Sequence, residues 1–342
     1  MKKFLSKLLG FSLIGIIPLL ALVILYLALD PFKIIKSYDS LIDPKEKCFV
    51  AINQDYVSTT TFIKNSKKIN YNSFIFGNSR SMFYQVAEWK KHLSNNSTCY
   101  HFDASGEGIW AIDKKIEFID KEGKEIKNVL LVLDYSVLIR DKPKSGHLFM
   151  ITPALVNNSN LIDFHETFLS SFLSPKFLYT YLDFKISGKI KPYMKENFLL
   201  DDRPRNYDVL TNEFKYNYFE KLMDQNKYYT PERLSVFYER DTLLQKFSPP
   251  ALHDSQKKIL SRMNSILKKH HTNLKIVINP LYNQKKLNNN DLVYLKNLFG
   301  SDNVFDFSGI NEFTKDYKNY YEAEHYRPQV ATKIMDVVYK NK

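Results

Sequence analysis

Short apolar runs alternate with segments of helical periodicity along much of this chain. The runs that suit buried β-strands cover residues 73–76, 97–103, 128–133, 274–279 and 303–307. Segments with apolar residues at helical spacing accompany them at residues 80–94, 109–121, 254–270, 290–299 and 328–339. Five strands that alternate with helices predict an α/β fold with a doubly wound, flavodoxin-like parallel sheet. Ligands bind such sheets at the carboxyl ends of the strands, so the residues just after each strand are candidates for chemistry.

The alternation stops between residues 145 and 250. This stretch is rich in Phe, Tyr and Lys, and prolines break it into short helical pieces. We therefore expect a large, mostly helical insertion within a domain of residues 71–342, which a connector at residues 31–70 precedes. The aromatic side chains suit a lid that presents ring faces to sugars, although aromatic residues at helical spacing more often belong to a packed core.

Residues 1–30 predict a short cytoplasmic stub and a membrane anchor. From Leu8 to Leu29 the chain has 22 residues without a charge, which as a helix would span roughly 33 Å, enough for a bilayer core. Three lysines precede this segment and Asp30 follows it, so the positive-inside rule places residues 31–342 outside the cytoplasm. A cleaved signal peptide is the alternative, but the segment exceeds the usual ~7–15 apolar residues.

The exported part of the chain is basic. The 342 residues include 49 Lys and Arg against 37 Asp and Glu, and 46 and 36 remain when three N-terminal lysines and Asp30 are removed. This excess suits anionic lipid headgroups and acidic or teichoic-type polymers, although a compositional bias toward Lys, Asn, Ile and Tyr is the simpler explanation. The predicted compartment disfavours nucleic acid as a partner.

The two cysteines, Cys48 and Cys99, both fall in the exported part. An oxidising compartment would permit one disulfide, whereas the strand-like surroundings of Cys99 suit a small buried residue equally well. Two cysteines without a nearby pair of histidines do not indicate a zinc site, so no metal is expected.

A serine follows the first predicted strand in the sequence Gly77-Asn78-Ser79-Arg80. Ser79 is expected at a helix N-terminus, where free amide groups and the helix dipole favour developing negative charge. That position suits a nucleophile, although serine is also a common helix cap.

A histidine near the other end of the chain is a candidate base for Ser79. His325 follows Glu322 by three residues and precedes a helix that begins at Pro328. A serine nucleophile needs a base, and the base needs an acid to hold its tautomer. Ser79, His325 and Glu322 therefore form a candidate catalytic triad.

These blocks together resemble the SGNH (GDSL-like) hydrolase superfamily. Gly77-Asn78-Ser79 is similar to its serine block, Ser105-Gly106 to its glycine block, and Glu322-Ala323-Glu324-His325 to its carboxylate-x-x-His block. The similarity is to the membrane-anchored, extracytoplasmic branch that includes DltD and the alginate and peptidoglycan O-acetyltransferases. It covers residues 70–135 and 270–342.

The resemblance implies that Ser79 is the nucleophile, His325 the base and Glu322 the acid, with the backbone amides of Ser79 and Gly106 as oxyanion hole. Two positions depart from the family pattern. Glu322 stands where the family usually has Asp, so its longer side chain must fold back toward the imidazole. Asp134 stands where the oxyanion-hole Asn is expected, and a carboxylate there would repel an oxyanion. Loss of one such donor typically costs about 2.7–4 kcal/mol of transition-state stabilisation.

Five residues close to the triad in this scheme are candidates for substrate binding: Asn78, Arg80, Ser105, Asp134 and Arg327. The two arginines suit an anionic substrate group, but pairing with a carboxylate of the protein is the simpler expectation.

The resemblance implies an extracytoplasmic serine acyltransferase that acts on O-acyl groups of a cell-envelope glycan or teichoic-like polymer without a cofactor. It also implies a multi-spanning membrane O-acyltransferase as a partner that delivers the acyl group. An esterase with the same site is one alternative, because hydrolysis and transfer share an acyl-enzyme. A catalytically degenerate scaffold that binds polymer or a membrane partner is the other, and Asp134 and Glu322 are the features that favour it.

Overall fold

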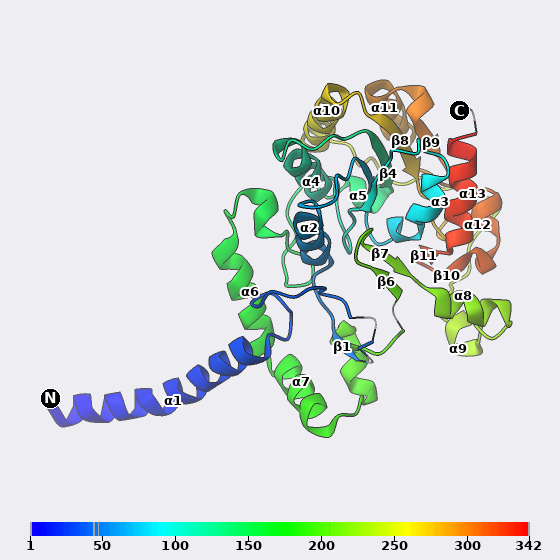
Figure 1. Ribbon diagram of the computed structural model, residues 1–342. Coiled ribbons are helices and arrows are strands. Elements are labelled where there is room, and N and C mark those ends of the chain that lie inside the picture. The colour runs from blue at the N-terminus through cyan, green and yellow to red at the C-terminus, as the bar shows by residue number, and fades with distance from the viewer. Residues whose placement is uncertain (1, 44, 47, 205, 341–342) are drawn as a thin grey trace.

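A five-stranded parallel sheet forms the centre of the protein. The computed structural model describes residues 2–43, 45–46, 48–204 and 206–340, with side chains from residue 16 onward except at 197 and 198. The sheet has the spatial order β3-β2-β4-β8-β9 (Figure 1) and consists of β2 (Ser73–Phe76), β3 (Cys99–His101), β4 (Asn128–Leu133), β8 (Asn273–Ile278) and β9 (Val304–Asp306). All neighbouring pairs are parallel. The prediction of a five-stranded parallel sheet is confirmed, and its strand order is the flavodoxin-like one.

β4 lies in the middle of the sheet and is buried along its whole length. It pairs with β2, where Asn128 lies opposite Ser73, and with β8, where Asn128 lies opposite Asn273. Its apolar side chains contribute alternately to two cores, Val129, Leu131 and Leu133 to one and Leu130 and Val132 to the other. The strand is apolar throughout because both of its faces are covered.

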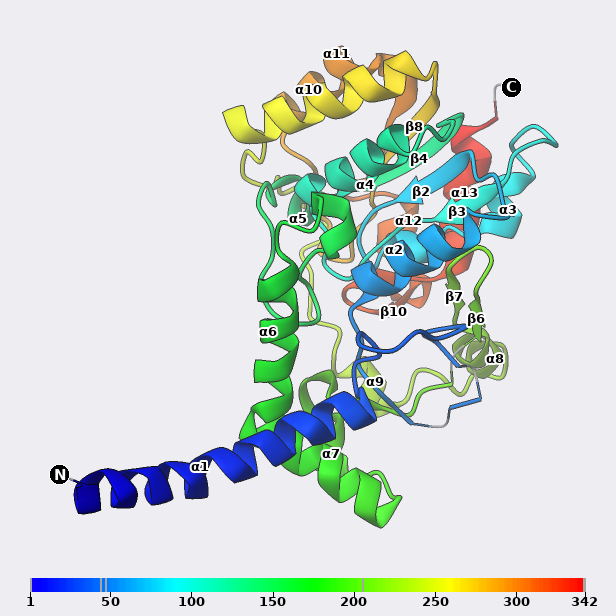
Figure 2. The ribbon, with the colours of Figure 1, turned by 60° about the vertical axis from the view of Figure 1, so that its left-hand side comes forward.

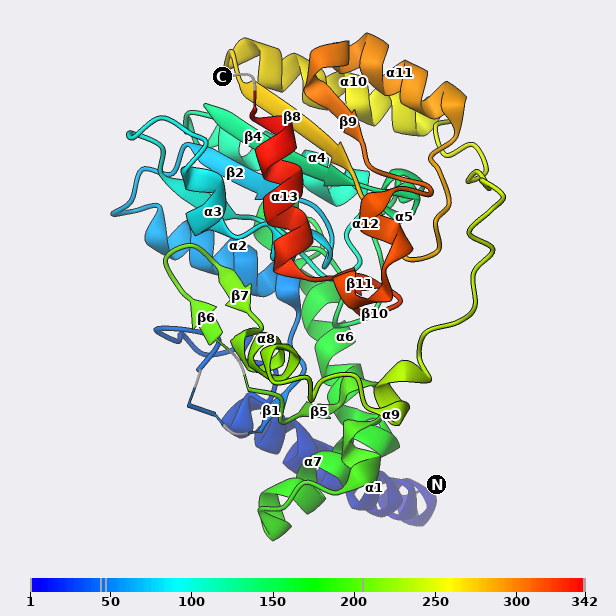
Figure 3. The same cartoon turned by 90° about the vertical axis from the view of Figure 1, so that its right-hand side faces the viewer.

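Helices cover both faces of the sheet. One face packs against α2 (Gln54–Asn65), α4 (Ile109–Lys121), α10 (Asp254–Lys269) and α11 (Asn289–Phe299). The other face packs against α3 (Val86–Lys90), α12 (Glu312–Lys315) and α13 (Pro328–Val338), and Figure 3 shows α13 in front of the strands. The isoleucine stripe of α4 is fully buried, as its helical spacing predicted: Ile109, Ile112, Ile116 and Ile119.

The segment after β2 differs from the sequence expectation. Residues 80–94, predicted as one helix, form a 3₁₀ turn at Ser81–Phe83 and the short α3. In a continuous helix the backbone N–H and C=O groups of this segment would bond to one another. Here some of them bond to side chains from distant parts of the chain. His101 Nε2 donates to the carbonyl oxygen of Ser81 at 2.9 Å, and the Glu213 carboxylate accepts the amide N–H of Val86 at 2.6 Å.

The expected connector at residues 31–70 contains β1 (Phe49–Val50) and α2. Asn53 caps α2 by accepting the amide N–H of Tyr56 at 3.0 Å. The helix buries Phe62 in the main core, so part of this stretch belongs to the packed domain.

The region between β4 and β8 combines helices with short antiparallel strands. Its helices are α5 (Tyr135–Leu138), α6 (Leu161–Leu173), α7 (Pro175–Ser187), α8 (Asn217–Asp224) and α9 (Pro231–Leu234). β5 (Leu200–Asp201) pairs with β1, and β6 (Asn206–Asp208) forms a hairpin with β7 (Glu213–Lys215). The β6–β7 hairpin and α8 lie near a second hairpin that follows β9 and consists of β10 (Tyr320–Glu322) and β11 (His325–Tyr326) (Figures 1 and 3).

α1 (Lys2–Leu29) projects away from the rest of the protein (Figure 2). At its C-terminal end, Tyr26 packs against Phe172 of α6, with 5.2 Å between ring centroids. Among the described residues, no helix has both the length and the apolar character needed to cross a membrane. Some side chains of the predicted span Leu8–Leu29 do not belong to the described part of the structure. The membrane anchor therefore stays a prediction.

Cys48 and Cys99 are both free thiols. The disulfide that the sequence left open therefore does not form in this structure. Cys99 is buried in β3, and burial raises the pKa of its thiol to about 12.

Candidate active site

The Ser79 hydroxyl meets the His325 imidazole, although 246 positions separate them in the chain. Ser79 Oγ lies 2.8 Å from His325 Nε2, and the opposite ring nitrogen, Nδ1, is hydrogen-bonded to Glu322 Oε1. A serine hydroxyl on one ring nitrogen and a carboxylate on the other is the arrangement of nucleophile, base and orienting acid. Because the carboxylate accepts the Nδ1 proton, Nε2 is left to take the proton of Ser79.

A β-hairpin brings Glu322 to His325. β10 (Tyr320–Glu322) and β11 (His325–Tyr326) are antiparallel, and Glu322 lies opposite His325 across the turn Ala323-Glu324. Cross-strand neighbours lie close enough for their side chains to interact. The hairpin thus provides the fold-back that the longer glutamate side chain requires.

Both carboxylate oxygens of Glu322 have partners. Oε1 binds His325, and Oε2 accepts the amide N–H of Glu324 at 2.6 Å. Burial alone would raise the pKa of Glu322, but the His325 hydrogen bond, this amide and nearby Arg80 hold the pKa below its ordinary value. Glu322 is therefore ionised at neutral pH and stabilises positive charge that develops on His325.

Ser79 lies in a turn and not at the start of a long helix. The helix predicted to begin there is replaced by the 3₁₀ turn Ser81–Phe83, so the helix dipole contributes less than the sequence analysis assumed. Phe83 in that turn packs against the His325 ring with 5.8 Å between centroids. This contact restricts the movement of the imidazole ring.

Asp134, Arg80 and Asn78 form a buried network beside the triad. The Asp134 carboxylate caps α5 by accepting the amide N–H groups of Ser136 and Val137. Arg80 Nη1 donates to the same carboxylate at 3.0 Å, and Asn78 Nδ2 donates to it at 3.2 Å. Burial would raise the pKa of Asp134, but Arg80 and these hydrogen bonds lower it. The carboxylate is therefore ionised, and Arg80 compensates its charge.

This network changes the expected role of Asp134. The sequence predicts a carboxylate whose charge repels an oxyanion, whereas in the structure the ion pair with Arg80 neutralises that charge. Arg80 also donates to the carbonyl oxygen of Glu324 at 3.0 Å and pairs with the Glu324 carboxylate. Arg80 thereby connects the Ser79 turn to the hairpin that carries His325.

Asn279, which follows β8, extends the network to the same hairpin. Its amide donates to Asp134 at 3.4 Å, and its oxygen accepts the hydroxyl of Tyr326 at 2.7 Å. The ends of β2, β4 and β8 therefore hold the hairpin together. These contacts position His325 against Ser79.

Arg327 pairs with a carboxylate of the protein, which was the simpler of the two roles expected for it. Its Nη2 lies 2.7 Å from Glu220 Oε2 of α8, and its Nε donates to Glu220 Oε1 at 3.2 Å. The pair joins the hairpin to the insertion.

A cavity of about 500 Å³ adjoins the triad. Ser79, His325, Ser105 and Gly106 all line it, so the glycine predicted for the oxyanion hole borders the same space as the candidate nucleophile. Aromatic and basic side chains of the insertion form much of the remaining wall: Phe149, Lys215, Tyr216, Phe219, Tyr228 and Arg233. The sequence showed this stretch to be aromatic and basic but did not indicate which of its residues reach the site.

The other candidates for substrate binding lie outside this lining. Asn78, Arg80, Asp134 and Arg327 direct their polar groups to the protein partners given above. Of the five candidates, only Ser105 borders the cavity. The structure therefore favours a positioning role for the other four.

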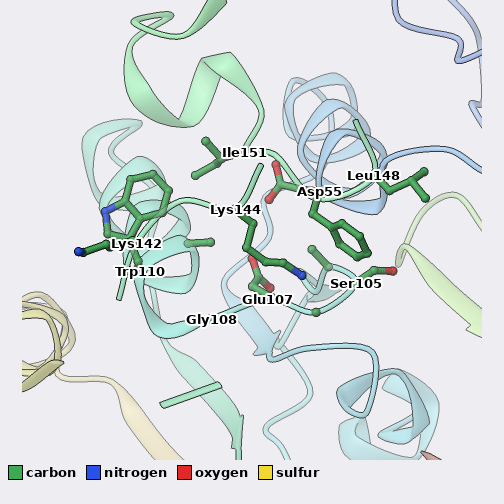
Figure 4. A pocket seen from close by; sticks show the side chains of 13 residues that line it. Asp55, Ser105, Glu107, Gly108, Trp110, Lys142, Lys144, Leu148 and Ile151 are labelled. Atoms are coloured by element: carbon green, nitrogen blue, oxygen red, sulfur yellow. The ribbon is translucent and has the colours of Figure 1, made fainter. Parts of the chain in front are cut away.

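A buried charge cluster, which the sequence did not indicate, lies close to Gly106. Lys115 forms ion pairs with Glu107 at 2.5 Å and with Asp55 at 3.4 Å, and all three side chains are at most 5% exposed. Figure 4 shows Glu107 and Asp55 near Lys144 around a second, smaller cavity, which shares Gly106 with the first. Burial raises the pKa of Glu107 to about 8 against the opposing effect of Lys115. The cluster fixes the loop after β3, and no local pattern signals it because its members come from separate segments.

Among the described residues, no group of three or more His, Cys, Asp or Glu side chains is placed to hold a metal ion. No protein-family model matches the chain, and no curated protein matches its sequence. The relation to the SGNH hydrolases therefore stays a prediction from the motifs, and the function is argued from the geometry of the site.

Proposed function

We propose that this protein is a serine acyltransferase that acts on O-acyl groups of a cell-envelope glycan or teichoic-like polymer. The observation that carries the proposal is the 2.8 Å contact between Ser79 Oγ and His325 Nε2, with Glu322 on the other ring nitrogen. This set of groups suits attack on a carbonyl carbon and reversible proton transfer. The similarity of the motifs to the SGNH superfamily supports the same class of reaction.

In the first half-reaction Ser79 Oγ attacks the acyl carbonyl, and its proton passes to His325 Nε2. The tetrahedral intermediate collapses when His325 gives that proton to the leaving oxygen, and the acyl group remains as an ester on Ser79. In the second half-reaction His325 takes the proton of an acceptor hydroxyl, whose oxygen attacks the ester. The proton then returns to Ser79. Backbone amides of Ser79 and Gly106 are the proposed donors to the oxyanion.

Hydrolysis is the second candidate reaction. The His325 side chain is 30% exposed, so water has access to the base and can replace a sugar hydroxyl as acceptor. The acyl-enzyme is common to both reactions.

Two features favour catalysis over a degenerate scaffold. Glu322 contacts His325 in spite of its longer side chain, and Asp134 has its charge compensated by Arg80. These were the two residues that had favoured a scaffold.

We further propose that the N-terminal segment anchors the protein in a membrane and that the α/β domain lies outside the cytoplasm. The uncharged residues 8–29, the lysines before them and the basic character of residues 31–342 support this location. An anionic or acylated envelope polymer and a multi-spanning membrane O-acyltransferase are the proposed partners.

Labelling with a fluorophosphonate probe tests the enzyme proposal. The natural protein should react, Ser79→Ala should not, and His325→Ala should react about 10²-fold or more slowly because it lacks the base. Ser81→Ala is the matched control, since Ser81 is a fully buried neighbouring serine whose hydroxyl donates to the carbonyl oxygen of Asn78. Absence of labelling in folded natural protein would contradict the proposal.

A further inference from the structure

Arg233 on α9 presents a positive charge to the cavity that contains Ser79. Its guanidinium carbon lies 4.2 Å from the ring centroid of Tyr228 and 4.9 Å from that of Phe219. Nη1 also donates to the Tyr228 hydroxyl at 2.9 Å. The two rings and this hydrogen bond hold the guanidinium in place and leave further N–H donors for a ligand.

Arg233 differs from three other arginines near the site, which pair with carboxylates: Arg80 with Asp134, Arg203 with Asp201 and Arg327 with Glu220. Among the described residues, no carboxylate lies within ion-pair distance of Arg233. Its partners are two aromatic rings and one hydroxyl, which orient a guanidinium without neutralising it. Such a group favours an incoming anion.

Tyr228 connects Arg233 to the catalytic hairpin. The hydroxyl that accepts from Arg233 donates in turn to the carbonyl oxygen of Tyr321 at 3.0 Å, and Tyr321 directly precedes Glu322. Arg233 and Ser79 line the same cavity of about 500 Å³, a size that holds a small-molecule ligand. A group bound at Arg233 would therefore lie in the same cavity as the triad.

Lys215 on β7 adds a second positive charge to the same wall. Its Nζ lies 3.9 Å from Glu213 Oε2, a long separation for an ion pair. The carboxylates that line the cavity have cationic or imidazole partners of their own, since Asp201 pairs with Arg203 and Glu322 binds His325. The wall formed by the insertion is therefore positive toward the cavity.

We propose that Arg233 and Lys215 form an anion subsite that binds a carboxylate or phosphate group of the polymer while Ser79 reacts with an acyl group. Arginine suits either anion because its planar fork binds two oxygens at once, and lysine adds a point charge. The subsite selects anionic over neutral polymers. Its part in catalysis rests on the proposed function, whereas the binding itself does not.

Calorimetric titration of full-length Ser79→Ala protein in a non-ionic detergent tests the subsite. The probes are an oligogalacturonate, a glycerol phosphate oligomer and a neutral xylo-oligosaccharide. We expect at least one anionic oligomer to bind more tightly than the neutral one, and the one that does so identifies carboxylate or phosphate as the ligand. Adding Arg233→Gln should weaken that binding about tenfold or more, because charge-assisted hydrogen bonds are lost. Arg233→Lys keeps the charge and should recover part of the affinity.

Arg203→Gln is the matched control for the loss of charge. It removes one positive charge from the same cavity, but Asp201 already pairs with that guanidinium, so the loss of affinity should stay within about threefold. Equal affinity for anionic and neutral oligomers would overturn the subsite, and so would equal losses in the two glutamine variants. Because binding is measured without the Ser79 hydroxyl, failure of probe labelling would contradict the enzyme proposal alone.

Discussion

Glu322 determines which nitrogen of His325 faces Ser79. Its pKa lies below the ordinary value, so the ionised carboxylate accepts the Nδ1 proton and leaves Nε2 unprotonated toward the serine. The side chain is partly exposed, but the hairpin and the Glu324 amide fix its direction. One carboxylate thus sets both the tautomer and the charge of the candidate base.

Glu322→Gln should lower kcat/KM for a simple acyl ester about 10²–10⁴-fold, because an amide can donate to Nδ1 and favour the wrong tautomer. Glu322→Asp keeps the charge but shortens the arm, and an intermediate loss is expected. Hydrolysis of p-nitrophenyl acetate measures the effect, with thermal unfolding as the control for folding. Full activity in Glu322→Gln would mean that another group orients His325.

The Asp134–Arg80 pair is expected to contribute to stability as well as to geometry. Asp134→Ala should lower the free energy of unfolding by about 3–5 kcal/mol, because the Arg80 charge loses its buried partner and keeps the more exposed Glu324. Glu196→Gln, which breaks the exposed Lys176–Glu196 pair, is the matched control and should cost less than about 1 kcal/mol. Urea denaturation measures both variants, and similar effects would contradict the assignment.

The pH dependence of this contribution follows from the lowered pKa of Asp134. The carboxylate is more acidic in the folded protein than in the unfolded chain, where its pKa is about 3.9. Its contribution is therefore present above about pH 4 and is lost as the pH falls through the folded-state pKa.

The β10–β11 hairpin is the element on which the site depends most. Arg80 holds its turn through Glu324, Asn279 holds Tyr326, and Arg327 joins it to α8. These contacts tie it to two strand ends and to the insertion. A change at any of these junctions should move His325 relative to Ser79.

The turn after β2 places its backbone against β4. A Cβ added at Gly77 would lie 2.8 Å from the Val132 carbonyl oxygen and 2.8 Å from Ser81 Cβ, closer than real contacts allow. Gly77→Ala should therefore lower the free energy of unfolding by about 3 kcal/mol and slow labelling of Ser79. Gly123→Ala is the control, because its added Cβ meets nothing within 4 Å and only the positive φ of +66° opposes it, at about 1–2 kcal/mol. Equal costs in chemical denaturation would argue against the crowding.

The whole molecule consists of the sheet domain, an insertion that walls the cavity, and α1. Aromatic residues of α6 and α7 form a separate core that includes the end of α1: Tyr26, Phe164, Phe168, Phe172 and Phe177. These rings are buried in a core, so for α6 and α7 the core alternative holds and the lid alternative does not. Aromatic residues elsewhere in the insertion, such as Tyr228, reach the cavity.

Two deletions test the role of α1. Removing residues 2–20 should release the protein from membranes, as measured in the salt-washed membrane fraction, while the unfolding temperature stays the same. Removing residues 2–29 should also lower the free energy of unfolding by at least about 2 kcal/mol, because Tyr26 is only 4% exposed and packs on Phe172. If the protein that lacks residues 2–20 stayed in the washed membranes, the proposed anchor would be contradicted.

Local pattern was sufficient for much of the fold. Short runs suited to buried strands identified all five strands, of which β4 is continuously apolar after Asn128, and the spacing of isoleucines in α4 identified the buried face of that helix. Pattern failed at residues 80–94, where His101 and Glu213 take backbone groups that a helix would pair. It also failed for α2, whose polar residues obscure an apolar stripe that buries Phe62.

Periodicity and short motifs are local properties, and they were enough to predict the alternation of strands and helices and the candidates Ser79, His325 and Glu322. The folded structure was needed to show that the Ser79 hydroxyl meets His325, that Arg80 neutralises Asp134, and that Arg233 lines the cavity with no carboxylate of the described residues in ion-pair distance. Each of these depends on contacts between distant segments. Such contacts follow from strand order, hairpin pairing and the packing of the insertion, and no local pattern specifies them.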